Sequence, residues 1–325
     1  MLPVPGTFWH HRGVPATPPS ADDPGAWPPA ADQAPRRRRR QEVDDSGISD
    51  KSEVWPPVRR MISLGIAGFA ALLTVGLVVG AQTTHESYAV VIFGVQVLFV
   101  GAWVIASGPP APRVVGVVGI AVAIGTDVAA VLTRPASLAP LAYVTAAGFI
   151  VGVVGQLTRP AGRQRVTESL GSSLVVTLGV VAFASLIVLG RIPHGTQAIV
   201  ACLAAAGIAI LIARLTDAIV ALPRIAPQVP RGGAGVVLGA MVGTAAAGVI
   251  GNLLEGISPL YSALAGLATA IVAVMVDLSV GYAEASRVIA GDEPALYLAR
   301  HIQGPLGAFA FAAPAAYVAS TLLLL

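Results

Sequence analysis

Two residue types are nearly missing from this sequence of 325 residues, which contains one cysteine, Cys202, and one lysine, Lys51. A single cysteine excludes an intramolecular disulfide and a metal cluster held by cysteines. Charge is scarce as well, because charged residues make up 11% of the chain, against about 25% in soluble domains. This shortage of charge excludes a soluble enzyme with a large core.

The few charges are unevenly placed. Residues 1–60 hold 9 of the 20 Lys and Arg residues and 8 of the 17 Asp and Glu residues, which leaves 11 basic and 9 acidic residues for the rest of the chain. Hydrophobic residues make up 55% of the sequence, and the mean hydropathy is +0.77. So few charges cannot solvate a globule of this size, and the composition predicts a polytopic membrane protein.

The first 60 residues are predicted to form a disordered tail. They contain 11 of the 25 prolines and a run of five arginines, Arg36 to Arg40, and they have no apolar periodicity. The arginine run could bind anionic phospholipid headgroups, at about 1 kcal/mol per residue near the membrane surface. It could equally be a solvated basic segment that sets the topology. Membrane lipids, rather than a nucleic acid, are the expected partners.

After the tail, the chain contains nine apolar segments of roughly the length needed to cross a membrane. They are Met61–Ala81, Tyr88–Ala106, Val114–Leu132, Leu138–Gly155, Ser172–Gly190, Gln197–Leu222, Gly235–Leu253, Pro259–Val280 and Pro305–Leu325. About 20 residues span the hydrocarbon core as a helix, and lipid requires backbone groups to be paired within each segment. We therefore expect an all-α integral membrane protein, with N-terminal helices over residues 61–155 and a second region over residues 156–325.

Arginines predict the orientation of these segments. With the tail in the cytoplasm, eight arginines fall in cytoplasmic loops: Arg113, Arg159, Arg163, Arg165, Arg224, Arg231, Arg287 and Arg300. The opposite loops hold only Arg134 and Arg191. The positive-inside rule then predicts a cell (inner) membrane protein with its N-terminus in the cytoplasm and its C-terminus outside. Three substantial loops would face the cytoplasm: Gln156–Gly171, Pro223–Ala234 and Gly281–Gly304.

Four ionisable residues fall inside the predicted spans: Asp127, Arg214, Asp217 and Asp277. Such residues are costly in a membrane, and they usually face a partner or a wet cavity. Arg214 and Asp217 are three residues apart and could pair along one helix. All four could be packing charges that neutralise one another. Alternatively, they form a polar site open to the cytoplasm, in which Asp217 and Asp277 are oxygen ligands for magnesium.

Three stretches of the C-terminal half together carry a resemblance to a known family of enzymes. Leu215–Ala218 places Asp217 near the end of a span, Ala226–Gly239 places a glycine-containing loop before the next helix, and Val276–Leu278 contains Asp277. An apolar helix with an internal proline, Phe309–Tyr317, follows. Over about residues 150–325 the chain resembles the phosphatidate cytidylyltransferases (CDP-diacylglycerol synthases), polytopic enzymes that join phosphatidic acid to CTP and release pyrophosphate. The resemblance implies nine spans with the active loops in the cytoplasm.

The chain departs from this family where the family carries its charges. Its signature Ser, Lys and Arg positions and its distal acidic cluster are occupied by Gly281, Glu284, Ala285, Gly304, Pro305 and Gly307, and its Lys-Thr or Lys-Ser pair by Gly232 and Gly233. Nucleotidyl transfer depends on positive charge at the phosphates and on several carboxylates around the metal ions. We therefore expect no transferase activity, and magnesium would be needed only by an active enzyme.

Phosphate binding could survive without catalysis. Four cytoplasmic arginines, Arg224, Arg231, Arg287 and Arg300, could bind a phosphate together, or they could serve only the positive-inside rule. Three functions are thus predicted as alternatives. The first is a catalytically inactive relative of the cytidylyltransferases that binds lipid or regulates phospholipid metabolism. The second is an active transferase that uses Asp217, Asp277, Asp292 and Glu293. The third is a small transporter with Asp127, Arg214, Asp217 and Asp277 along a proton or ion path. A homo-oligomer is compatible with each.

Overall fold

The computed structural model describes residues 60–158, 165–226, 229–291 and 296–324. The chain divides into two units, Met1–Ser52 and Glu53–Leu325, and all the described residues belong to the second unit. The predicted disordered tail with Arg36 to Arg40, and the acidic pair Asp292 and Glu293, therefore lie outside the described residues.

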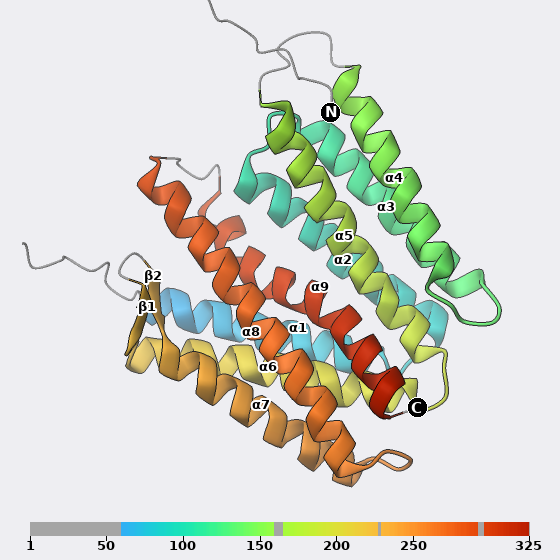
Figure 1. The fold of residues 1–325 in the computed structure, drawn as a ribbon, viewed down its shortest axis with the longest axis vertical. Coiled ribbons are helices and arrows are strands. Elements are labelled where there is room, and N and C mark those ends of the chain that lie inside the picture. The colour runs from blue at the N-terminus through green and yellow to red at the C-terminus, as the bar shows by residue number, and fades with distance from the viewer. Residues whose placement is uncertain (1–59, 159–164, 227–228, 292–295, 325) are drawn as a thin grey trace, which may run out of the picture. The chain divides into compact units, whose positions relative to one another are not determined.

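Nine long helices make up nearly all of the described chain (Figure 1). They are α1 (Arg60–Gly80), α2 (His85–Ser107), α3 (Pro112–Leu132), α4 (Ala139–Leu157), α5 (Val166–Gly190), α6 (Gly195–Ile219), α7 (Gly233–Leu253), α8 (Pro259–Ile289) and α9 (Tyr297–Leu323). Each is long and apolar enough to cross a membrane. The prediction of an all-α, multi-pass membrane protein is confirmed for this part of the chain.

Local sequence signals start and stop several of these helices. Thr84 precedes α2, and its side chain accepts a hydrogen bond from the backbone N–H of Ser87 at 3.3 Å. Gly108 ends α2 in the left-handed conformation with φ of 54°, which glycine adopts without steric cost. Prolines occupy the first turn of α3, α4 and α8, where the missing N–H would have no helical partner anyway.

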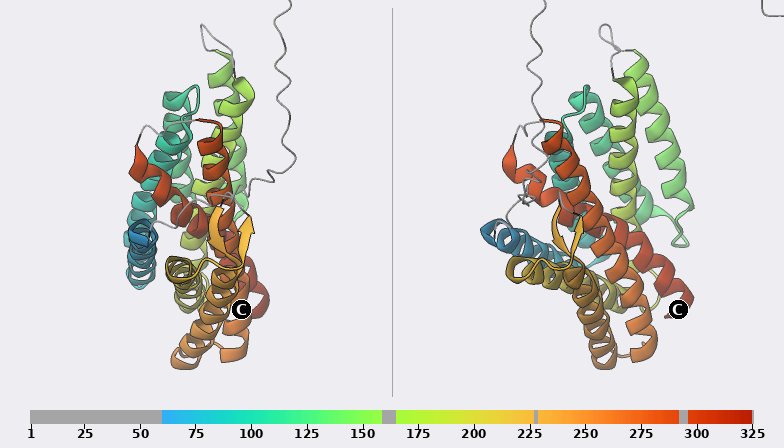
Figure 2. Two further views of the ribbon diagram at one scale, coloured as in Figure 1. Left: turned by 90° about the vertical axis from the view of Figure 1, so that its left-hand side faces the viewer. Right: turned by 60° about the vertical axis from the view of Figure 1, so that its left-hand side comes forward.

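The helices pack in two groups that α9 connects (Figures 1 and 2). In the N-terminal group, α3 packs against α2, α4 and α5, while in the C-terminal group α6 packs against α1, α7 and α8. Helix α9 contacts α2 and α5 on one side and α6 and α8 on the other. Short connections make successive helices alternate in direction. We call the end at which α1 begins and α8 ends the proximal end, and the opposite end the distal end.

Close packing in each group depends on small residues next to large ones. In the N-terminal group the buried ring of Phe99 lies against Gly179, where a side chain would collide with it, and stacks edge-on with Phe183 at a centroid distance of 6.0 Å. In the C-terminal group, Gly235, Gly239 and Gly243 of α7 face backbone atoms of α6. Small residues allow helices to approach closely where lipid provides no hydrophobic drive.

The predicted loop Gly281–Gly304 is wrong over much of its length. Helix α8 continues to Ile289, and α9 already begins at Tyr297, so that Pro305 lies inside a helix rather than at its start. Charged residues ended the apolar segments in the sequence, but a helix that leaves the hydrocarbon core can continue with a polar face. The consequence is that Glu284, Arg300 and His301 lie on helices.

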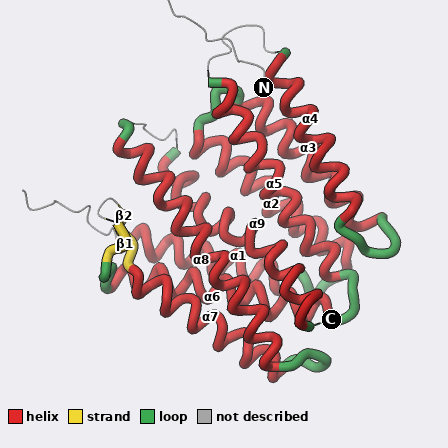
Figure 3. Tube along the Cα trace, viewed as in Figure 1, coloured by secondary structure: helices red, strands yellow, loops and turns green. Residues whose placement is uncertain are grey.

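The predicted loop Pro223–Ala234 also has regular structure. It contains the antiparallel strands β1 (Arg224–Ala226) and β2 (Val229–Gly232) (Figure 3). Val229, Arg231 and Gly232 are buried, and β2 contacts α6, α7 and α8. This short hairpin at the proximal end carries Arg231 toward the helix ends.

Candidate functional site

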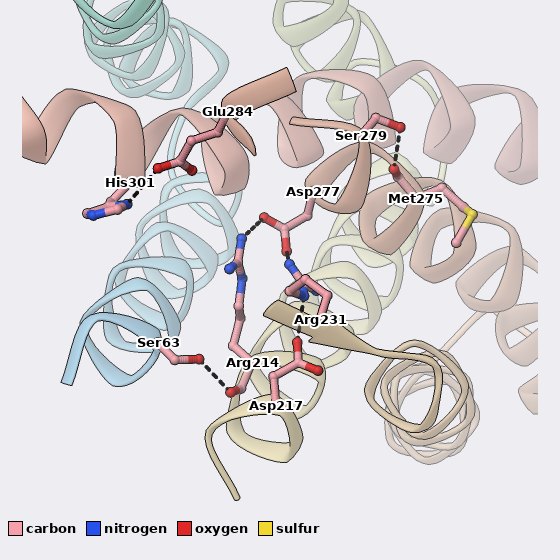
Figure 4. A network of polar contacts seen from close by, with 9 residues as sticks. All are labelled: Ser63, Arg214, Asp217, Arg231, Met275, Asp277, Ser279, Glu284 and His301. Atoms are coloured by element: carbon pink, nitrogen blue, oxygen red, sulfur yellow. Dashed lines mark hydrogen bonds and ion pairs between the residues drawn. The ribbon is translucent and has the colours of Figure 1, made fainter. Parts of the chain in front are cut away.

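Two arginines and two aspartates form a buried charge network in the proximal halves of α6 and α8 (Figure 4). Arg214 Nη2 donates to Asp277 Oδ1 at 2.5 Å, and Arg231 Nη1 donates to Asp277 Oδ2 at 2.7 Å. Arg231 Nε lies 2.5 Å from Asp217 Oδ2 as an ion pair. The side chains of Asp217, Asp277 and Arg231 are at most 4% exposed. The four charges balance, which reduces the cost of burying them.

The hairpin and the helix ends hold this network in place. The backbone N–H of Gly232 donates to Asp217 Oδ1 at 2.8 Å, so β2 contributes both a side chain and a backbone donor. Ser63 of α1 donates its hydroxyl to the backbone oxygen of Arg214 at 2.7 Å. Burial lowers the pKa of Arg231, but Asp277 and Asp217 outweigh burial and raise this pKa above its ordinary value. Arg231 is therefore a permanent cation.

Two glycines leave the space that the aspartates occupy. A Cβ atom at Gly304 of α9 would lie 2.5 Å from Asp277 Oδ1, and one at Gly235 of α7 would lie 2.8 Å from Asp217 Oδ1. Both distances are shorter than real contacts allow. Helices α7 and α9 can therefore lie close to the two carboxylates, because glycine has no side chain at these positions.

A pocket of about 430 Å³ opens beside the network. Its lining comes from the proximal ends of α1, α6, α8 and α9 and from β2. Arg214, Asp217 and Arg231 line one part of it, while apolar side chains line much of the rest: Ile62, Ile66, Val229, Val280, Val288 and Ile289. A volume of this size is typical of small-molecule sites.

A second polar group, from α8 and α9, also lines the pocket. His301 Nδ1 of α9 lies 3.7 Å from Glu284 Oε1 of α8, and the ring of Tyr297 meets the ring of His301 edge-on at a centroid distance of 4.3 Å. Arg300 also lines the pocket, and it is 5% exposed. The lining of the pocket thus combines two polar groups with an apolar surface.

Hydrogen-bond donors exceed acceptors in the charge network. Asp277 accepts from both arginines, and Asp217 is occupied by Gly232 and Arg231. Yet Arg214 Nε and Arg231 Nη2 are buried without an acceptor among the described residues. Buried donors without a partner carry a free-energy cost. A ligand with several acceptor oxygens would remove it.

The arrangement does not suit a metal ion. In the described ranges, no group of three or more His, Cys, Asp or Glu side chains could hold one. Asp217 and Asp277, the predicted magnesium ligands, spend their oxygens on arginines and on a backbone N–H. A guanidinium thus occupies the position between the carboxylates that a cation would take.

The structure brings some predicted residues together and separates others. Arg214 and Asp217, which were expected to be able to pair with each other, each have a partner from another element. Arg231 and Arg300 share the pocket. Of the other predicted phosphate-binding residues, Arg224 lies on β1, and Arg287 Nη1 donates to the backbone oxygen of Ala106 at 3.1 Å.

Asp127 lies apart from this site. It is in the distal half of α3, a helix that packs against α2, α4 and α5, and it accepts a hydrogen bond from Gln96. Arg214 and Asp277 lie in the proximal halves of their helices. The structure does not join the four predicted intramembrane charges into one chain of contacts.

Sequence reasoning missed four polar residues of the pocket: Ser63, Glu284, Tyr297 and His301. Ser63 is an ordinary polar residue in an apolar helix, and nothing in the sequence distinguishes it. The other three fell within a predicted loop. A helical reading of residues 281–304 would have placed Glu284 and His301 at the same end as Asp277.

Comparisons with known proteins do not add to this description, because no family model, no curated protein and no solved structure matches the chain. The fold and the site define the class: a multi-pass helical membrane protein with a compensated Arg–Asp network beside a pocket at one end of its helices.

Proposed function

We propose that this protein binds an anionic phospholipid in the proximal pocket and does not transfer nucleotides, as a catalytically inactive counterpart of the phosphatidate cytidylyltransferases. The observation that carries the proposal is a pair of buried donors, Arg214 Nε and Arg231 Nη2, which have no acceptor within the described part of the chain and belong to two residues that line the pocket. A phosphate group offers only acceptor oxygens, and guanidinium groups bind it with charge-assisted hydrogen bonds.

The apolar part of the pocket favours a lipid over a small soluble anion. Val288 and Ile289 line it and are 60% and 72% exposed, so they form an outer apolar rim at the end of α8. An acyl chain could lie along this rim while the headgroup reaches the arginines. Phosphate and apolar surface together are the chemistry of a phospholipid. The proposed ligand class is therefore an anionic phospholipid, of which phosphatidic acid is an example.

The state of the aspartates supports an absence of catalysis. Nucleotidyl transfer by two metal ions needs carboxylates that are free to coordinate them. Asp217 and Asp277 are each held by an arginine, and Gly232 and Gly304 stand where a lysine and an acid of the resembled family would act. Loss of one electrostatic contact of this kind costs about 100-fold in rate. Several such losses together favour a binding or regulatory role in phospholipid metabolism.

Lipid binding can be tested with purified protein in detergent. We expect phosphatidic acid to raise the melting temperature, while phosphatidylcholine and inorganic phosphate do not. A285W should fill the pocket, since Ala285 lines it, and should weaken binding by about tenfold or more, which corresponds to about 1.4 kcal/mol. A283W is the matched control, because Ala283 is exposed on the same helix. Equal effects of the two substitutions, or stabilisation by phosphate alone, would contradict the proposal.

Catalysis needs a separate assay. Purified protein with CTP, phosphatidic acid and magnesium should release no pyrophosphate above background. Turnover that D277N abolishes would overturn the inactive assignment and support an active transferase with a rearranged site.

The proposal includes an orientation in the cell membrane, with the pocket and the N-terminus in the cytoplasm and the C-terminus outside. The distribution of arginines between the two sets of loops supports it. Cys202 is buried, so the wild-type chain offers a quiet background for a thiol probe. A membrane-impermeant maleimide should label Q82C in intact cells and T158C only after permeabilisation, because the two exposed positions lie at opposite helix ends. The reverse pattern would invert the topology.

A further inference from the structure

A buried polar pair in the N-terminal helix group has no role in the pocket. Gln96 of α2 is fully buried, and Asp127 of α3 is 7% exposed. Gln96 Nε2 donates to Asp127 Oδ1 at 2.9 Å and to the backbone oxygen of Val180 of α5 at 3.1 Å. The pair therefore lies where α2, α3 and α5 meet.

The remaining oxygens of the pair lack donors. Gln96 Oε1 and Asp127 Oδ2 are both buried without a hydrogen-bond partner among the described residues. The amide cannot be turned around to help, because Oε1 would then face two other acceptors, Asp127 Oδ1 and the oxygen of Val180. A single hydrogen between Gln96 Oε1 and Asp127 Oδ2 would therefore give both acceptors a hydrogen-bond partner.

Within the described ranges, no cation compensates the Asp127 carboxylate. Among the residues that the structure describes, no arginine, lysine or histidine nitrogen forms an ion pair with Asp127. Arg191, which follows α5, donates to the backbone oxygen of Ala130, three residues along α3 from Asp127, rather than to the carboxylate. An isolated ionised carboxylate in an apolar interior is very unfavourable, and such a group takes up a proton instead.

We propose that Asp127 and Gln96 form a buried proton-binding site, in which Asp127 is a neutral carboxylic acid whose Oδ2–H donates to Gln96 Oε1. The two groups then exchange hydrogen bonds in both directions, as an acid and an amide do in a cyclic pair. One proton satisfies both orphaned acceptors and removes the uncompensated charge. This site is independent of the lipid pocket, because it lies in the distal half of a different helix group.

Other ionisable groups at the distal end are exposed or lie away from Asp127, so none of them can take the place of the proton on its carboxyl group. On the elements packed against α3 they are His85, Glu86 and Tyr88 of α2 and Tyr143 of α4, with Arg134 and Arg191 in the neighbouring connections. Of these, only Tyr88 is buried. Its hydroxyl also lacks a partner, and it lies two helical turns from Gln96. Folding should therefore take up a proton at Asp127 itself.

Infrared spectroscopy tests the protonation state directly. At neutral pH the wild type should show the C=O stretching band of a protonated carboxyl group, and D127N should lack it. E86Q is the matched control, because Glu86 is an exposed carboxylate on α2, and it should leave the band unchanged. Absence of the band in the wild type, or its persistence in D127N, overturns the proposal.

A pH series of melting temperatures gives a second readout. D127N reproduces the neutral acid, since its amide can donate to Gln96 Oε1 and accept from Gln96 Nε2, so it should match the wild type in acid. As the pH rises, the wild type should lose stability relative to D127N, because the folded state holds a proton that the unfolded chain releases. Parallel curves overturn the proposal. Stabilisation of the wild type alone by sodium or potassium, without the carboxyl band, would also overturn it and identify a metal cation as the ligand.

Discussion

Arg231 and Asp277 are 46 residues apart in the sequence, yet Arg231 Nη1 donates to Asp277 Oδ2 at 2.7 Å inside the protein. The arginine comes from a two-stranded hairpin, and the aspartate comes from a membrane-spanning helix. Arg231 also pairs with Asp217, so one guanidinium fastens the hairpin to α6 and α8 together. We therefore expect the integrity of the pocket to depend on this cation.

Replacement of Arg231 should therefore destabilise the protein strongly. R231M leaves Asp217 without its cation and Asp277 with one cation instead of two, and breaking a buried pair costs about 3–5 kcal/mol. The melting temperature in detergent should fall accordingly. R224M is the control, because Arg224 lies on the same hairpin and does not line the pocket. Equal melting temperatures for R231M and the wild type would show that the network does not hold the fold.

Arg214 and Asp277 should be energetically coupled. Each single substitution, R214M or D277L, leaves an unbalanced charge in the network, while the double variant removes one charge of each sign. The double variant should therefore be more stable than the sum of the single effects predicts, by about 0.5–3 kcal/mol. Melting temperatures or denaturant unfolding of the four proteins measure this coupling. Strict additivity would contradict the ion pair that the structure describes.

The sequence predicted the spans and three members of the network, but not their pairing. Asp217, Asp277 and Arg214 were recognisable because charges are rare in apolar helices. Their partner Arg231 lay in a predicted loop, where the sequence marked it only as one of four candidate phosphate-binding arginines and not as a partner of the aspartates. A hairpin of two short strands determines its position, and such a contact across the sequence leaves no periodic signal.

The other boundary errors have one physical cause. Hydropathy reports where a helix leaves lipid, not where it ends, so Glu284 and Arg300 marked the end of a span while the helix continued beyond them. These helical extensions form the walls of the pocket. Asp127 is also an ionisable residue in an apolar helix, but its partner is the neutral Gln96. A rare charge in a span therefore does not by itself predict an ion pair.

Metal removal should leave the protein unchanged. Asp217 and Asp277 are occupied by arginines and by Gly232, and no cluster of metal-binding side chains exists in the described part of the chain. EDTA should therefore alter neither the melting temperature nor the stabilisation by phosphatidic acid. Magnesium added afterwards should leave both quantities unchanged. Loss of stability in EDTA that magnesium reverses would show that an ion belongs to the folded site.

Gly304 should be intolerant of a side chain. A Cβ atom there would lie 2.5 Å from Asp277 Oδ1 and 3.3 Å from Arg214 Nη2, so G304A must displace the ion pair. Destabilisation by about 1–3 kcal/mol is typical of such overpacking. On the same helix, G307A introduces contacts no shorter than 3.6 Å and should have a small effect. Melting temperatures of the two variants check the difference, and equal values would contradict the close approach of α9 to the network.

The contact between α6 and α7 should be equally sensitive to a single methyl group. A Cβ atom at Gly239 would lie 2.4 Å from the backbone oxygen of Ala209, and a backbone atom cannot rotate away as a side chain can. G239A must therefore push α7 outward along the line of Gly235, Gly239 and Gly243, at a cost of about 1–3 kcal/mol. At Gly248 of the same helix the nearest atom would be 3.4 Å away, a side-chain carbon of Ala263. G248A should be neutral or slightly stabilising, since alanine favours a helix over glycine by up to about 1 kcal/mol.

Because α7 also borders Asp217 through Gly235, G239A should weaken phosphatidic acid binding as well as lower the melting temperature. Weakened binding with an unchanged melting temperature would contradict the packing argument, because the methyl group reaches the pocket only by moving the helix.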